Sequence, residues 1–158
     1  WKEGEPGIHG TIWTERIMER KDNPKYDIDE NPSFQGSCWI MKKSYYEYLE
    51  LLDIANWGSF ANEAQEIGFK AWLSGGKVMV NKKTWYAHLH KGTKYGRGYF
   101  ISEGTFAVGR QHTMKWISGT KWKKQKHPFS WMIEHFMPMP TWPENWLEEL
   151  RKKGHDIR

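Results

Sequence analysis

The sequence predicts an α/β fold, or α+β if the chain is a fragment, because helical and strand-like patterns alternate in its middle third. Residues 44–52 carry apolar side chains at positions i, i+3, i+4 and i+7, the stripe of an amphipathic helix. A second helix is expected at 60–73, where an apolar face ends at Gly75 and Gly76, residues typical of a helix C-terminus. Two short strands, at 77–80 and 84–90, are expected to follow.

Shorter patterns predict the remaining elements. Residues 10–20 fit a strand or a short helix, 21–32 a loop, 34–41 a buried strand, and 106–116 and 128–136 two further helices. Ser44 with Glu47, and Thr141 with Glu144, have the spacing of a capping box and predict the starts of the first and last helices. We therefore divide the chain into an irregular N-terminal segment (1–33), a half-domain (34–90), and a loop with a Trp-rich helical extension (91–158).

Composition limits the class of protein. The 158 residues suffice for one domain, and the net charge of +5 with a pI near 9.2 favours an anionic partner such as a sugar nucleotide, nucleic acid or a membrane surface. The basic stretch 121–126 also fits a solvated loop. Cys38 is the single cysteine, which excludes an internal disulfide and predicts a core thiol in a cytoplasmic protein. No apolar stretch reaches transmembrane length, and the first residue, Trp1, leads us to expect a longer parent protein.

The eleven tryptophans allow two interpretations. They supply large apolar areas to a core that is otherwise poor in aliphatic residues, or they form a surface on which sugar rings or bases stack. The sequence favours neither.

Two histidines at the end of the second expected strand are candidate metal ligands. Alternation along 84–90 places Tyr86, His88 and His90 on one face and apolar residues on the other. Two ligands are fewer than a divalent ion needs, so exposed or hydrogen-bonded histidines are the alternative.

Acidic residues at the start of the 60–73 helix are candidate catalytic groups. Glu63 and Glu66 lie in its first turns, where the helix dipole stabilises negative charge, or where a carboxylate beside a cleft would bind a sugar hydroxyl. Asp27 and Asp29 form a D-x-D, the metal motif of sugar-nucleotide enzymes. We interpret it as a chance match, because no hydrophobic strand precedes it.

Residues 35–46, QGSCWIMKKSYY, resemble the AGGxFxIxRxYF segment of GT-A-fold glycosyltransferases, a fold that includes the polypeptide N-acetylgalactosaminyltransferases. Residues 60–76 are similar to their acidic motif W-G-G-E-N-x-E-[IL]-S-F-R-x-W-x-x-G-G: both acids, the Ile, the Phe, a basic residue, the Trp and the glycine pair fall in place without a gap. Counting on, the metal-binding histidine of that family matches His88. The resemblance covers about 34–90 and implies the C-terminal half of a GT-A domain, without its nucleotide-binding half.

The resemblance also implies roles for individual residues. Glu63 would contact the donor sugar or the acceptor hydroxyl, Glu66 would support it within the catalytic pair, and His88, with His90, would bind Mn²⁺ or Mg²⁺. The candidate substrate-binding residues are Gly36, Ser37, Trp57, Lys91, Lys94 and Arg97. The implied partners are a nucleotide-sugar donor, a glycan or other hydroxyl acceptor, and the missing N-terminal half of the same protein.

Departures from the family pattern leave alternatives open. Ala64 replaces the Asp that serves as general base in many inverting members, so inversion and retention both remain possible. The main competing hypothesis is a non-enzymatic module that binds glycan, or less favourably single-stranded nucleic acid, through Trp stacking and a basic patch. An assembly protein that uses the fold as a scaffold is the third.

Overall fold

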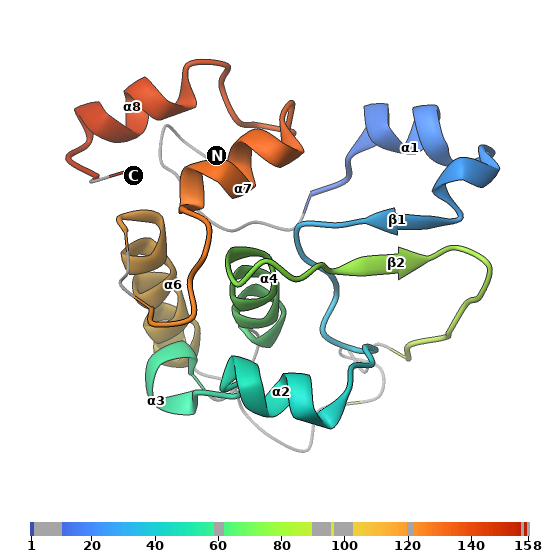
Figure 1. Cartoon of the computed structure of the whole chain (residues 1–158), viewed down its shortest axis with the longest axis horizontal. Coiled ribbons are helices and arrows are strands. Elements are labelled where there is room, and N and C mark those ends of the chain that lie inside the picture. Colours follow the sequence, from blue (N-terminus) through green and yellow to red (C-terminus); the bar gives the residue numbers. More distant parts are fainter. Residues whose placement is uncertain are drawn as a thin grey trace.

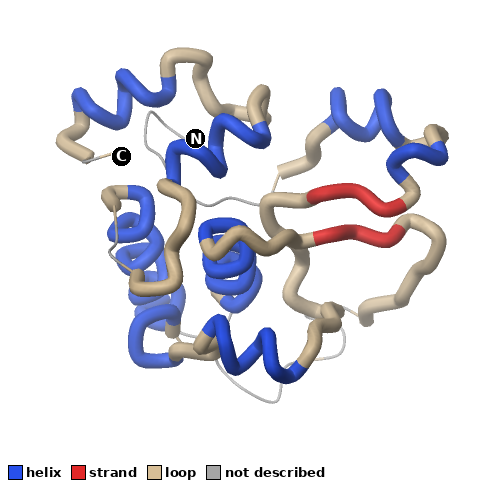
Figure 2. Tube along the Cα trace, viewed as in Figure 1, coloured by secondary structure: helices blue, strands red, loops and turns tan. Residues whose placement is uncertain are grey.

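The computed structural model describes residues 1, 11–58, 62–89, 96, 103–119, 122–155 and 157. Within them the chain is α+β: helices pack around a central helix, and a two-stranded antiparallel sheet lies at one side (Figures 1 and 2). The elements are α1 (Thr14–Arg20), the 3₁₀ helix η1 (Pro24–Tyr26), β1 (Ile28–Glu30), α2 (Lys43–Leu49), α3 (Ile54–Trp57), α4 (Glu63–Leu73), β2 (Met79–Asn81), α6 (Glu103–Ile117), α7 (Phe129–Phe136) and α8 (Trp146–Lys152).

The central helix is α4, which in Figure 1 lies between α6, α7 and α2. Nine of its eleven residues are buried, including the polar Glu66 and Lys70. Phe69, Trp72 and Leu73 belong to the larger apolar cluster, whereas Ile67 and Ala71 belong to a smaller one with Leu49 and Leu51. Because α4 is surrounded by other elements, its packing fixes the position of its N-terminal residue, Glu63.

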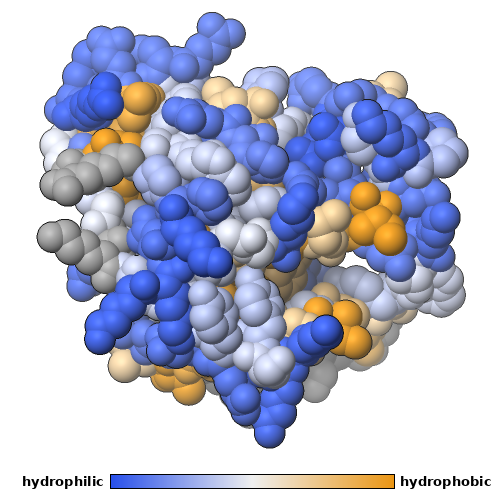
Figure 3. Space-filling model, in the orientation of Figure 1, coloured by the Kyte–Doolittle hydropathy of each residue, from blue (hydrophilic) through white to orange (hydrophobic). Residues whose placement is uncertain are grey.

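Most tryptophans contribute to the core. Trp57, Trp72, Trp116 and Trp146 are buried, five others are half-buried, and only Trp39 and Trp85 are exposed. The core interpretation is therefore confirmed for most of these side chains. The face shown in Figure 3 is accordingly mainly hydrophilic, with small separate hydrophobic spots.

The sheet attaches α1 to the rest of the molecule. β1 and β2 pair with Ile28 opposite Asn81 and Glu30 opposite Met79. Asp29, the middle residue of β1, is buried and accepts hydrogen bonds from Arg16 (3.2 Å) and Arg20 (2.9 Å) of α1. Its carboxylate is therefore paired with protein cations, and the other acid of the D-x-D, Asp27, pairs with Lys83 at 2.9 Å.

The sheet is also linked to α7. Glu30 accepts hydrogen bonds from Lys77 and from His135 Nε2 (2.7 Å), a residue of α7. The hydrogen bond from Lys77, supported by the one from His135, holds the pKa of Glu30 below its ordinary value. The prediction that 21–32 is a loop was wrong, because β1 forms by pairing with the distant β2. The irregular segment 1–33 stays a prediction, since residues 2–10 lie outside the described residues.

Two strand predictions were also wrong. Residues 34–41 contain a turn, with Cys38 exposed and Ile40 97% exposed, because Phe34 and Met41 pack on the smaller cluster and the residues between them loop outward. Residues 84–89 form no strand either, and Trp85 (86%) and Leu89 (65%) are exposed rather than directed into a core. The described part of the chain offers neither segment a partner strand.

The helix predictions were right about where most helices lie but less accurate about the residues at which they begin. Helices α1, α2, α4, α6 and α7 occur where expected, and α4 ends before Gly75, whose φ of +85° suits glycine. Ser44, however, lies inside α2, which begins after Lys42. Thr141 has a φ of +68°, so α8 begins only at Trp146. The short α3 lies between α2 and α4, where no helix was expected.

The expected half-domain and helical extension share one core. The larger cluster joins Trp57, Phe69 and Trp72 to Trp116, Ile133 and other residues of the extension. The extension therefore packs against 34–90. Among the described helices, none combines the length and apolar character that crossing a membrane requires.

Candidate functional site

Glu63 lies at the N-terminus of α4, against the loop formed by residues 35–37. It is the first residue of the helix and is only partly buried, at the end where the helix dipole favours negative charge. A Cβ atom added to Gly36 would lie 2.3 Å from Glu63 Oε1. The glycine therefore lets the carboxylate rest directly on the backbone of the 35–37 loop.

The same loop is hydrogen-bonded to the segment that carries His88. Tyr86 OH lies 2.7 Å from Ser37 Oγ and donates a hydrogen bond to Gln35 Oε1 at 3.0 Å. His88 is two residues further along this exposed segment. The 35–37 loop thus contacts both the helix that bears Glu63 and the segment that bears His88.

Exposed aromatic rings lie next to this loop in the sequence. Trp39 follows Ser37 by two residues and is 39% exposed, while Trp85 precedes Tyr86 and is 86% exposed. A sugar makes hydrogen bonds through its hydroxyl groups and apolar contacts through the faces of its ring. The polar groups of this loop suit the first kind of contact, and the exposed aromatic rings suit the second.

Sequence reasoning did not propose Tyr86 or Gln35 as site residues. Tyr86 was expected on the same face as His88, and this was the only sequence feature that could have identified Tyr86 as a site residue. The segment is not a strand, so the alternation that suggested it does not apply. The hydrogen bonds to the 35–37 loop depend on a separate part of the chain.

Glu66 does not belong to the exposed site. It is 1% exposed, and its carboxylate accepts hydrogen bonds from Lys70 Nζ (2.6 Å) and from the backbone N–H groups of Leu52 (3.1 Å) and Asp53 (3.3 Å). Lys70 in turn donates to the carbonyl oxygen of Glu50 (2.6 Å). Glu66 therefore holds the turn between α2 and α3. Its carboxylate is enclosed by these donors and has almost no contact with solvent.

The expectation that Trp57 binds substrate was wrong. Its side chain is 1% exposed and packs against Phe69, His112 and Trp116. Burial also lowers the pKa of His112, whose Nε2 accepts a hydrogen bond from Trp116 Nε1 at 2.9 Å. Trp57 is a core residue at the contact between α3 and α6.

A metal site is not assembled by the described residues. His88 supplies one exposed imidazole, and no group of three or more His, Cys, Asp or Glu side chains within the described ranges is arranged to hold an ion. Such a group is what a divalent cation requires. His90, Lys91, Lys94 and Arg97 lie outside the described residues.

The basic stretch is partly engaged in the fold. Lys124 pairs with Glu50 Oε1 at 2.8 Å and donates to the carbonyl oxygen of Tyr48, and the hydrogen bond from Lys124 lowers the pKa of Glu50. Trp122 packs against both apolar clusters. The described residues 122–126 therefore do not combine exposed, coplanar Trp rings with lysines in the way that a stacking module requires.

Comparison with known proteins adds no assignment: no protein-family model, curated protein sequence or solved structure matches the chain.

Proposed function

We propose that this chain is the acceptor-side half of a nucleotide-sugar glycosyltransferase of the GT-A type. It would transfer a sugar to a hydroxyl acceptor once it is combined with a nucleotide-binding half. The observation that carries the proposal is the contact of the Glu63 carboxylate with Gly36 at the 35–37 loop. These residues belong to the two motifs, 35–46 and 60–76, on which the resemblance depends.

In this proposal Glu63 works at the acceptor. A carboxylate at a helix N-terminus, partly open to solvent, accepts a hydrogen bond from an acceptor hydroxyl and orients its oxygen toward the sugar that is transferred. Ser37, Gln35 and Tyr86 already share hydrogen bonds, so a sugar hydroxyl would join a preformed polar network.

The metal has no step in this proposal. The resemblance implies Mn²⁺ or Mg²⁺, but His88 alone does not make a site for either ion among the described residues. Metal dependence is therefore a question for experiment, and the proposal is independent of its answer.

The test is a screen for donor hydrolysis and sugar transfer by the longer parent protein, which would include the nucleotide-binding half, with and without Mn²⁺. Glu63→Gln should reduce turnover by about 10²-fold or more, the size of effect expected for a positioned acid–base group. The control Glu134→Gln, at an exposed position of α7, should leave turnover unchanged. Equal turnover in the wild type and Glu63→Gln would refute the proposal. His88→Ala in the same screen tests whether the metal requirement depends on this histidine.

A glycan-binding module without catalysis is the second candidate. The exposure of Trp39 and Trp85 beside the 35–37 loop favours it, because exposed Trp rings stack on sugar faces. The two functions differ in one measurement. A binding module retains its glycan affinity in Glu63→Gln and loses it in Trp85→Ala. It also hydrolyses no donor, either as the isolated chain or within the longer parent protein.

A further inference from the structure

A second feature of the molecule is the contact of α6 with α3 and with the start of α4. Gly109, His112 and Trp116 have the spacing i, i+3 and i+7, so they lie on one face of α6. A Cβ atom added to Gly109 would lie 2.0 Å from Asn62 Nδ2 and 2.6 Å from the carbonyl oxygen of Trp57. The glycine therefore lets this face of α6 rest directly on Asn62, the residue before α4.

The imidazole ring of His112 lies at the centre of this contact. It packs edge-to-face against the indole ring of Trp57, with the ring centroids 4.8 Å apart. Its Nε2 accepts a hydrogen bond from Trp116 Nε1 at 2.9 Å, so this nitrogen carries no proton and the ring is neutral. Both tryptophans are buried, whereas His112 is half-buried. The imidazole is thus held between two buried indoles but is still within reach of protons from solvent.

The charged groups around His112 come from three elements. Asp53, at the start of α3, favours the protonated ring, whereas Lys115 of α6 and Lys70 of α4 disfavour it. Lys70 is itself paired with Glu66. Burial has the largest influence, and it lowers the pKa of His112. The surroundings of the ring therefore favour its neutral form.

A proton on Nε2 of His112 conflicts with the group that faces it. The indole nitrogen of Trp116 is a donor only, so two N–H groups would point at each other. The two side chains lie one turn apart on the same helix, so movement of α6 as a rigid body would not separate them. Because Trp116 is buried in the larger apolar cluster, His112 is the side chain that turns out toward solvent. It then loses its contact with Trp57.

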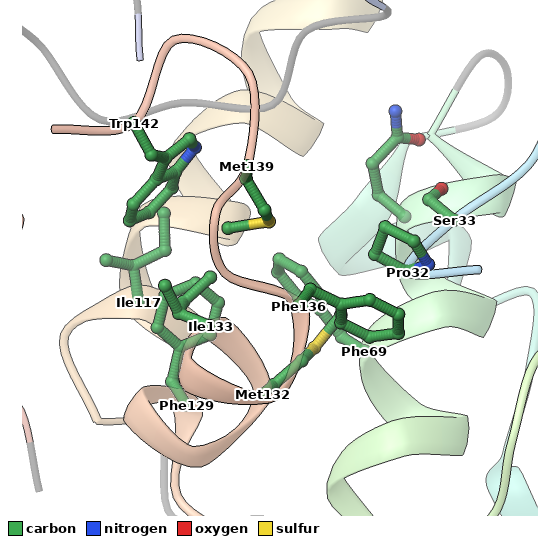
Figure 4. Close-up of a pocket in the computed structure, with 11 residues that line it drawn as sticks. Pro32, Ser33, Phe69, Ile117, Phe129, Met132, Ile133, Phe136, Met139 and Trp142 are labelled. Carbon is green, nitrogen blue, oxygen red and sulfur yellow. The ribbon is translucent and has the colours of Figure 1, made fainter. Parts of the chain in front are cut away.

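The end of α6 has a separate anchor. Ile117 is buried and lines an apolar pocket together with Phe129 and Ile133 of α7 (Figure 4). All three belong to the larger apolar cluster. Loss of the contact between His112 and Trp57 therefore frees the middle of α6 while its last residue stays in place.

We propose that His112 is a proton-operated latch between α6 and α3. While its ring is neutral, it contacts Trp116 and Trp57 and holds α6 against Asn62. When the ring takes up a proton, it turns to solvent, and α6 separates from α3 and from the start of α4. Glu63 follows Asn62, so acid changes the surroundings of this carboxylate. The proposal does not rest on sugar transfer, because the latch acts through contacts that exist whatever Glu63 binds.

The experiment is amide hydrogen exchange of the whole 158-residue chain at about pH 7.5 and about pH 5.5, with rates corrected for the pH dependence of chemical exchange. Because the open form binds one proton more readily than the closed form, the open fraction should rise by up to about tenfold between these pH values. We expect the protection of residues 109–116 to fall several-fold, up to this limit, and the indole N–H of Trp116 to exchange faster. The protection of α7 should change much less, because the opening is local.

Histidine variants identify the group that takes up the proton. His112→Gln retains an acceptor for Trp116 but does not titrate, so the protection of α6 should no longer depend on pH. His155→Gln is the matched control, because His155 Nδ1 lies 2.6 Å from Ser118 Oγ, just beyond the end of α6, and this variant should behave like the wild type. A pH dependence that persists in His112→Gln, or disappears in His155→Gln, would contradict the proposal. Equal loss of protection in α6 and α7 of the wild type, a comparison that needs no variant, would show global unfolding and overturn the latch.

Discussion

The buried Glu66–Lys70 pair allows the most quantitative prediction. Both side chains are almost fully buried, at 1% and 4% exposed, and their charged atoms are 2.6 Å apart. Lys70→Met removes the cation and leaves the carboxylate in the interior with only the N–H groups of Leu52 and Asp53. It also removes the donor to the carbonyl oxygen of Glu50.

Breaking a buried pair by removing one partner costs about 3–5 kcal/mol, because an uncompensated charge stays in the low-dielectric interior. A domain of this size has a free energy of unfolding of about 5–15 kcal/mol, so Lys70→Met removes a large share of it. With an m-value of about 2 kcal/mol/M, the urea midpoint should fall by about 2 M. The melting temperature should fall by about 6–20 °C.

The assay is equilibrium urea unfolding followed by Trp fluorescence, since Trp72 of α4 and Trp57, which packs on Phe69 of α4, are both buried in the core. The matched control is Lys43→Met. Lys43 pairs with Glu47 at the same i, i+4 spacing, but the two side chains are 89% and 61% exposed, so the change should cost at most about 0.5 kcal/mol. If Lys70→Met costs no more than Lys43→Met, the buried pair does not hold the turn and the structural role of Glu66 is wrong.

Three further predictions follow from close contacts and burial. Gly68→Ala should destabilise the fold by about 1–3 kcal/mol in the same urea assay, because its Cβ would lie 2.7 Å from the backbone oxygen of Pro32, which cannot move without the chain; a loss below about 0.5 kcal/mol contradicts this. Gly36→Ala should leave stability nearly unchanged but lower the turnover of the longer parent protein at least tenfold, because the added methyl group displaces the flexible Glu63 carboxylate. Unchanged turnover would argue against the contact between Gly36 and Glu63. Burial lowers the pKa of His112 below its ordinary value of 6.5, so between these two pKa values the unfolded chain binds a proton that the folded chain does not. The free energy of unfolding should therefore fall as the pH falls below 6.5. His112→Gln should reduce this dependence of the free energy of unfolding on pH.

Local sequence patterns predicted the helices well. The stripe of Tyr45, Leu49 and their neighbours located α2, and the glycine at position 75 located the end of α4. These features depend on side chains within one or two turns, and such interactions are present in the sequence itself. The helical pattern at 60–73 likewise predicted Glu63 in the first turn of a helix, and Glu63 is the first residue of α4.

Predictions that needed a partner from elsewhere in the chain were less successful. Cys38 and Trp85 lie in apolar runs, but whether a run is buried depends on a neighbouring segment to cover it, and the described chain provides none. Asp29 has the sequence context of a loop residue until Arg16 and Arg20 approach it from α1.

The sequence by itself determined the approximate positions of most helices, the absence of an internal disulfide within the 158 residues, and which acids lie in the first turns of the central helix. The tertiary structure alone decided that Glu66 is buried and Glu63 is partly exposed, although the two lie one turn apart. α4 is covered on nearly every side, so its periodicity does not reveal which residue faces the turn at Leu52 and which faces the 35–37 loop. That assignment depends on packing between segments distant in the sequence, and local patterns carry no record of it.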